Sequence, residues 1–304
     1  MQIGTNQFYE KNASQLGKLS AQADTLNTQI ATGKQFTAPS QNVVAYNRLT
    51  AIKQTNADSK AYASNVSLAQ SLLQQSDTTL TSVSNRLQRA AELTTQAANG
   101  TLSDANRKTI ATELQSIRDD LVSLAGTTDA RGQPLFGTAS GGAAVVKAAD
   151  GTVSFGGTGE ISAIPVADGT EIQATDSAQR VFGNIPTSGG GTTDVFAVLS
   201  SLISALNAGG NVSAATGAAA DGLKAAMTQV SNVQGSVGAR AARLDIVSAQ
   251  ATDAAAARET DRAGLEDTDI STAITELQKT MTVLQATQAS FTKLGQLSLF
   301  DYLR

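Results

Sequence analysis

The sequence predicts a mainly α-helical protein: a long antiparallel helical rod with paired N- and C-terminal coiled-coil helices and a small β-rich insert at the tip. In both flanks of the chain, apolar residues recur at alternating spacings of three and four, which is typical of helices packed along a seam. No proline lies between Pro39 and Pro134 or after Pro186, so long helices are possible there. The segment 137–192 instead holds 12 of the 26 glycines, which favours turns.

The polar residues of this chain are mostly neutral. Charged residues make up 16% of the sequence, against roughly 25% in an average soluble domain. Serine, threonine, glutamine and asparagine take their place, and such a composition suits surfaces that neighbouring molecules cover. The net charge of −4 provides no basic patch for a nucleic acid. We therefore expect protein partners and no nucleic-acid partner.

Several classes of chemistry lack their usual residues. The chain has no cysteine and no histidine, so it lacks disulfides, thiolate metal ligands and the commonest general base. We expect no enzyme activity, no cofactor and no metal site. No apolar run approaches the length of a membrane span, and the start "MQIGTNQFYEKN" lacks the basic-then-apolar order of a secretory signal. We expect no membrane insertion.

The N-terminal flank predicts three helices. Gly33 and Pro39 interrupt the first of them. A second apolar run, from Val66 to Ala97, is long enough for a helix of roughly 50 Å. The turn "ANGTLSD" then offers Gly100 as a helix stop and Ser103 as the N-cap of a third helix. So short a connection makes the second and third helices antiparallel.

The glycine-rich segment predicts short strands. The stretches "GTVSFGG", "EISAIPVADGTEIQA" and "QRVFG" contain β-branched residues, and Asp-Gly pairs at Asp150-Gly151 and Asp168-Gly169 are typical of hairpin turns. Helix resumes at 195–206, and a long alanine-rich helix is expected over 223–262.

The last helix is expected to begin after Gly264, with Asp267 or Asp269 as its cap. The residues at three-four spacing in this helix are Ile270, Ile274, Leu277, Met281, Leu284, Gln288 and Phe291.

The two terminal helices are expected to pair, because each is a little over thirty residues long and each carries heptads. A two-helix hairpin leaves half of each apolar stripe unburied, so we predict that this pair forms an assembly interface. The apolar end of the chain, "LSLFDYLR", would continue the same seam. The predicted interface consists of Leu16, Leu19, Ala23, Leu26, Ile30, Ile274, Leu277, Met281, Leu284, Phe291, Leu299, Phe300 and Leu303.

Three other features were candidates for ligand sites. The cluster Glu266, Asp267 and Asp269 has carboxylates for a divalent cation, but its spacing is not that of a calcium loop and its position favours helix capping. The stretches "FGGTGE" and "SGGG" lack the strand-to-helix context of a phosphate loop, so we expect turns. In "NRLQRAAEL", Arg89 and Glu92 have the spacing of an ordinary helical ion pair.

Four stretches resemble the flagellin family, which comprises bacterial flagellins and their junction relatives. "LQRAAELTTQAANGTLSDANRKTIATEL" resembles the family's helical hairpin, and "QIATGKQFTAPS" the segment after its first helix. "TDARGQPLFGT" is similar to its turn into the outer domain, and "LEDTDISTAITELQ" to its entry into the C-terminal helix. This chain has Gln41, Asn42 and Val43 where family members often carry two aspartates and a proline.

The resemblance implies an extracellular structural subunit of the bacterial flagellum, exported with a cytoplasmic chaperone through the type III route and without a cleavable signal peptide. It implies a homo-oligomeric ring layer at the hook–filament junction, between another hook-associated protein and flagellin. Two alternatives stay open: a short flagellin that builds the filament itself, and a glycan- or receptor-binding module on a helical stalk.

The expected domains follow from the same pattern. Residues 1–42 and 265–304 would form the terminal coiled-coil domain, 43–136 and 193–264 the helical rod, and 137–192 the small outer domain.

Overall fold

The computed structural model describes residues 2–157, 159, 161–187 and 190–302, and the side chains of residues 2–6, 8 and 294–302 lie outside that description. The chain divides into two compact units. The terminal unit comprises 1–58 and 253–304, and the central unit comprises 59–252. Two long helices, α2 (Val43–Ala97) and α6 (Ser213–Glu266), contribute to both units. The three-domain division expected from the sequence stays a prediction.

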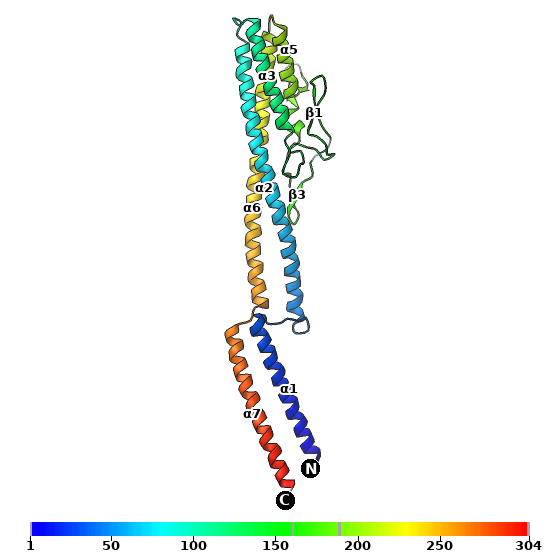
Figure 1. Ribbon diagram of the computed structural model, residues 1–304, viewed down its shortest axis with the longest axis vertical. Coiled ribbons are helices and arrows are strands. Elements are labelled where there is room, and N and C mark those ends of the chain that lie inside the picture. The colour runs from blue at the N-terminus through cyan, green and yellow to red at the C-terminus, as the bar shows by residue number, and fades with distance from the viewer. Residues whose placement is uncertain (1, 158, 160, 188–189, 303–304) are drawn as a thin grey trace. The chain divides into compact units, whose positions relative to one another are not determined.

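In the terminal unit, α1 (Gln2–Thr32) and α7 (Ile270–Tyr302) lie side by side and antiparallel (Figure 1). This confirms that the terminal helices pair. Helix α1 ends where Gly33 adopts φ +69°, a conformation that glycine takes at little cost. Helix α7 begins at its cap Asp269, whose carboxylate accepts the backbone N–H groups of Ser271 and Thr272 at 3.0 and 3.2 Å.

The long helices of the central unit are parts of α2 and α6, together with α3 (Asp104–Ala125) and α5 (Val195–Ala208). Helix α2 ends before Gly100, and Ser103 caps α3 as predicted, because its side chain accepts the N–H of Asn106. Figure 1 shows α3 running back along α2, which confirms the predicted antiparallel hairpin.

One apolar core runs through the central unit. The predicted stripe of α2 is fully enclosed, and Leu80, Leu87 and Leu114 have no exposed surface. Phe182 sits between two other rings, 5.9 Å from Phe136 and 5.5 Å from Phe196 between centroids. The insert therefore contributes to the same core as the helices.

The insert consists of three separate antiparallel strand pairs, β1–β2, β3–β4 and β5–β6. Gly151 and Gly169 take positive φ at the two predicted Asp-Gly turns. The first turn connects β1 to β2, and the second connects β3 to β4. The strand β1 lies beside α3 (Figure 1). The strands are β1 (Val145–Lys147), β2 (Val153–Phe155), β3 (Ile164–Ala167), β4 (Thr170–Ile172), β5 (Ile185–Pro186) and β6 (Thr192–Thr193).

The type of one predicted element and the boundaries of another were wrong. The stretch "QRVFG" is not a strand but most of the short helix α4 (Ala178–Phe182), because Ser177 caps its N-terminus and Val181 and Phe182 enter the core together. Helix α6 begins about ten residues earlier than expected and continues through Gly264 to Glu266. None of the described helices is both long and apolar enough to cross a lipid bilayer.

Candidate assembly interface

The candidate site is the surface of the α1–α7 pair. On α1, the five predicted residues lie on one face: Ala23 is buried, and Leu16, Leu19, Leu26 and Ile30 are half-buried. The helix presents this face to α7 because its apolar residues repeat at spacings of three and four. We call the contact between the two helices the seam.

On α7, the seam uses a register that differs from the predicted one. Leu277 and Leu284 are half-buried as expected, but the other enclosed positions are the small residues Ala273 and Thr280. Ile274 and Met281 are each 41% exposed and lie outside the seam. Small side chains let two helices approach closely, so alanine and threonine occupy the positions that hydrophobicity alone assigned to isoleucine and methionine.

Ile270, Ile274 and Met281 form a second apolar surface on α7, which we call the outer stripe. At 3.6 residues per turn, these three residues fall on one line, about 70° around the helix from the seam. All three are between 41% and 49% exposed. Within the chain, α1 leaves the outer stripe accessible to another molecule.

The other predicted interface residues lie near the end of the chain. Phe291 is half-buried and its ring contacts that of Tyr9, so it belongs to the seam. Leu299 and Phe300 fall on the α7 backbone with side chains outside the described atoms, and Leu303 lies outside the described residues.

Threonine hydroxyl groups on both helices bond to their own backbone. On α7, the hydroxyl of Thr282 donates to the carbonyl of Gln278 at 2.9 Å, and that of Thr287 to the carbonyl of Val283 at 2.7 Å. These groups therefore need no further partner. The same bond, four residues back, is made by Thr25, Thr28, Thr32 and Thr275.

The end of α1 and the end of α6 meet at an elbow that sequence reasoning did not foresee. The backbone N–H of Gln35 donates to the carbonyl of Glu266 at 2.8 Å, and that of Thr268 donates to Gly33 at 2.9 Å. The Glu266 side chain is buried with 7% exposed, and it pairs with Lys34 at 2.5 Å and Arg262 at 2.8 Å. Glu266 therefore takes no part in the capping that was predicted for this acidic cluster, whereas Asp269 does cap α7.

The elbow residues that depart from the family pattern close the loop before α2. The side chain of Gln41 accepts the N–H groups of Thr37 and Ala38 at 2.7 and 3.2 Å. Asn42 accepts the N–H of Ala45 at 3.0 Å, which caps α2. The neutral side chains of Gln41 and Asn42 thus stabilise the turn and cap the helix.

The remaining sequence candidates have ordinary structural roles. Arg89 pairs with Glu92 at 3.0 Å, as predicted, and also with Glu113 of α3 at 2.7 Å. Within the described residues, no three acidic side chains converge where a metal ion could be held. The stretches "FGGTGE" and "SGGG" lie only partly within the described residues.

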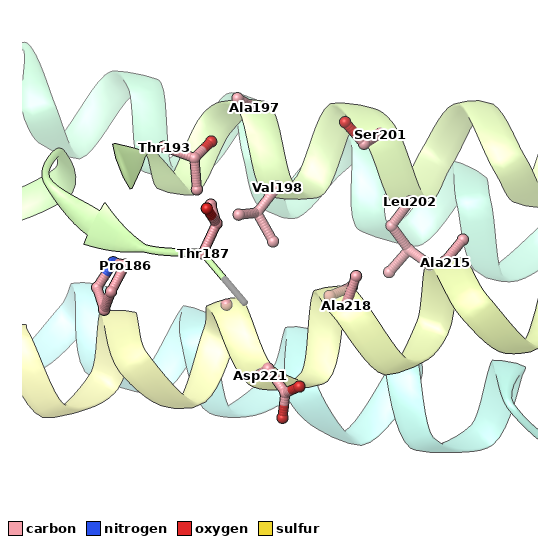
Figure 2. Close-up of a pocket in the computed structure, with 12 residues that line it drawn as sticks. Pro186, Thr187, Thr193, Ala197, Val198, Ser201, Leu202, Ala215, Ala218 and Asp221 are labelled. Atoms are coloured by element: carbon pink, nitrogen blue, oxygen red, sulfur yellow. The ribbon is translucent and has the colours of Figure 1, made fainter. Parts of the chain in front are cut away.

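A pocket of about 200 Å³ lies in the central unit between the β5–β6 hairpin, α5 and α6 (Figure 2). Val198 and Ala218 line it from the two helices, and the hydroxyl groups of Thr187 and Thr193 line it from the hairpin. The Asp221 carboxylate points away from this space (Figure 2). A hydroxyl group needs a neighbouring base to act as a nucleophile, and the described lining residues place none beside these threonines.

Comparison with known proteins matches both flanks of the chain. The bacterial flagellin N-terminal helical region matches residues 3–154, and the bacterial flagellin C-terminal helical region matches residues 220–303. The chain is 30% identical, over the whole length of both proteins, to "Flagellar hook-associated protein 3" of Salmonella typhimurium.

The chain is also similar to a flagellin and to a solved structure. A flagellin of Listeria monocytogenes is 27% identical, but the match covers only 61% of this chain and 73% of that protein. A solved structure described as a flagellar hook-associated protein from Vibrio parahaemolyticus shares the fold, with a TM-score of 0.67 at 24% identity, covering 75% of this chain and 100% of the other.

Proposed function

The chain belongs to the bacterial flagellin family, and from this membership we propose that it is the structural subunit that forms the junction between the hook and the filament of a flagellum. The observation that carries the proposal is the end-to-end match to a hook-associated protein 3, whereas the flagellin match stops at 61% of the chain. A structural role agrees with a composition that has no histidine or cysteine.

The α1–α7 pair is the part of the chain that we assign to assembly. The seam joins the helices within one subunit, and the outer stripe is free to pack against neighbouring copies in a ring layer. Burying a large aliphatic side chain contributes about 1.5–3 kcal/mol when it is complete, so half-exposed residues offer about half of that each. Several such residues per subunit, repeated around a layer, sum to a strong interaction.

The proposed partners are further copies of this chain, another hook-associated protein on one side and flagellin on the other. We further propose that the chain is exported through the flagellar type III route and is located outside the cell. Before export, a cytoplasmic chaperone would cover the apolar terminal helices. The outer stripe supports the chaperone step, because an apolar surface that stays exposed before assembly promotes aggregation.

The test is the position of the labelled protein along sheared, intact flagella. We expect an antibody label in one short band at the boundary between hook and filament. Label distributed along the filament would instead support the alternative that the chain is a short flagellin, which the partial match to a flagellin favours. In the same way, purified protein that grows long filaments alone would contradict the junction role.

A matched pair of variants adds a control. Leu284→Asp places a carboxylate in the seam, and Thr282→Asp places one on the opposite face of α7. The junction band should disappear with the first variant and persist with the second.

A further inference from the structure

The elbow holds a buried carboxylate, that of Glu266, which has two cationic partners. Glu266 is the last residue of α6, and its two carboxylate oxygens are divided between two partners. Oε1 lies 2.5 Å from the Lys34 ammonium, and Oε2 lies 2.8 Å from the Arg262 guanidinium. Lys34 follows α1, whereas Arg262 is on α6, so one buried side chain joins segments from the two ends of the sequence.

Two backbone bonds surround this ion group. Gln35 donates to the carbonyl of Glu266, and Thr268 donates to the carbonyl of Gly33, at 2.8 and 2.9 Å. They form a short antiparallel bridge between Lys34 and Asp267. The bridge is too short to be stable alone, because a two-stranded pair of this length buries little surface. The ion group supplies one side-chain contact across the bridge, and the apolar cluster of Phe36 and Leu265 lies beside it.

We propose that Lys34, Glu266 and Arg262 form an ionic latch, which fixes the end of α1 to the end of α6 and which opens when Glu266 gains a proton. A protonated carboxyl group keeps its shape but loses its charge attraction to both cations. Lys34 would then lose its partner at the elbow, and Arg262 would keep only the exposed carboxylates of Glu259 and Asp267, so the contact that joins Lys34 to the end of α6 would weaken.

The other charged groups at the elbow do not replace Glu266. Glu259 and Asp267 lie 2.8 and 3.5 Å from Arg262, but both of these carboxylates are more than half exposed. Asp269 is engaged as the cap of α7. The residues of α2 that are buried here, Ala45 and Leu49, are apolar and form a cluster with Phe36 and Leu265.

The direction of the acid response follows from the ion pairs. Hydrogen bonding from Lys34, together with the bond from Arg262, holds the pKa of Glu266 below its usual range. A carboxylate with a lowered pKa stabilises the folded form fully above its unfolded value of about 4.3, and this stabilisation is lost as pH falls through the lower folded value. The latch should thus be closed at neutral pH and open only in distinctly acid solution.

The test measures hydrogen exchange at the amides of Gln35 and Thr268 in the full-length chain, corrected for intrinsic exchange rates at each pH. At about pH 7, Glu266→Gln should reduce the protection of both amides by about tenfold or more, because it removes the buried carboxylate that holds the ammonium of Lys34. Glu259→Gln removes an exposed carboxylate that also binds Arg262, and it should change protection by less than about threefold.

Acid provides the second arm. Wild-type protection should fall as the pH is lowered below about 4.3, and Glu266→Gln should show a smaller fall because residue 266 then no longer titrates. The double variant Lys34→Met with Glu266→Gln should be no less protected than Glu266→Gln alone. Three results would show that the proposal is wrong. The amides of Gln35 and Thr268 could be unprotected in the wild type at neutral pH, or their protection could be independent of pH. Glu266→Gln and Glu259→Gln could also change the protection equally. Because the readout is local, it does not depend on where the chain assembles.

Discussion

The ring of Tyr9 packs edge to face against the ring of Phe291, with centroids 5.4 Å apart and planes at 87°. One ring comes from the start of α1 and the other from the second half of α7, so this contact sets the register of the seam far from the elbow. At the other end, the bridge between Lys34 and Asp267 sets the same antiparallel register. Two fixed points along a helix pair define which face of α7 stays exposed.

A charge in the seam should separate the terminal helices. Leu284→Asp places a carboxylate among apolar side chains, which should weaken the α1–α7 pair by roughly 2–5 kcal/mol. The central unit should melt at the same temperature as in the wild type, whereas far-ultraviolet circular dichroism should show less helix. Thr282→Asp should reproduce the wild-type spectrum. Equal loss of helix in the two variants would contradict the assignment of the seam.

A charge on the outer stripe should act only on assembly. Met281→Asp changes an exposed position, so the stability of the isolated chain should move by no more than about 0.5 kcal/mol. Sedimentation of the chain with its assembly partners should nevertheless decrease several-fold, because each neighbour would cover the new carboxylate. Normal sedimentation of Met281→Asp would remove the outer stripe from the proposed interface.

The insert should matter for the stability of the central unit. Phe182→Ala empties the space between two other phenylalanine rings and should cost about 3–5 kcal/mol in urea denaturation. Phe182→Leu should cost less, about 1–2 kcal/mol, since more of the volume is kept. Val146→Ala, at an exposed position of β1, serves as the control and should be nearly neutral. A neutral Phe182→Ala would mean that the insert folds independently of the helices.

A buried ion pair joins the insert to α6. Arg240 contacts the carboxylate of Asp176, which is 2% exposed, and also donates to the carbonyl of Gln173 at 2.7 Å. Arg240→Met leaves that buried charge without its main partner and should cost about 3–5 kcal/mol. Adding Asp176→Asn should recover part of the loss, because the unpaired charge is then gone. Purely additive losses would show that the pair is not coupled.

Periodicity predicted the helices well, because apolar residues at three-four spacing in α1, α2 and α3 face a core that exists in the folded chain. It was less successful on α7, where Leu277 and Leu284 fit two registers and only contact with α1 selects between them. In α4, local preferences were misleading: β-branched Val181 and aromatic Phe182 favour a strand, but the Ser177 cap and the core select a helix.

The elbow was the least predictable part of the candidate site. Lys34 and Glu266 are distant in sequence, and neither has a spacing that marks an ion pair. Only the meeting of the chain's two ends brings them together. Asp269 was predictable because a cap acts on the residues that directly follow it.

The threonine hydroxyls that bond back to their own helices have a thermal consequence. A hydroxyl group that already donates to its own helix, as that of Thr287 does, loses little hydration enthalpy when a neighbour covers it, so apolar burial dominates the association. Association of this kind carries a negative heat-capacity change and weakens on cooling. Layers built through α1 and α7 should therefore loosen in the cold and tighten in sulfate, while moderate changes in sodium chloride, which screen only charges, leave them nearly unaffected.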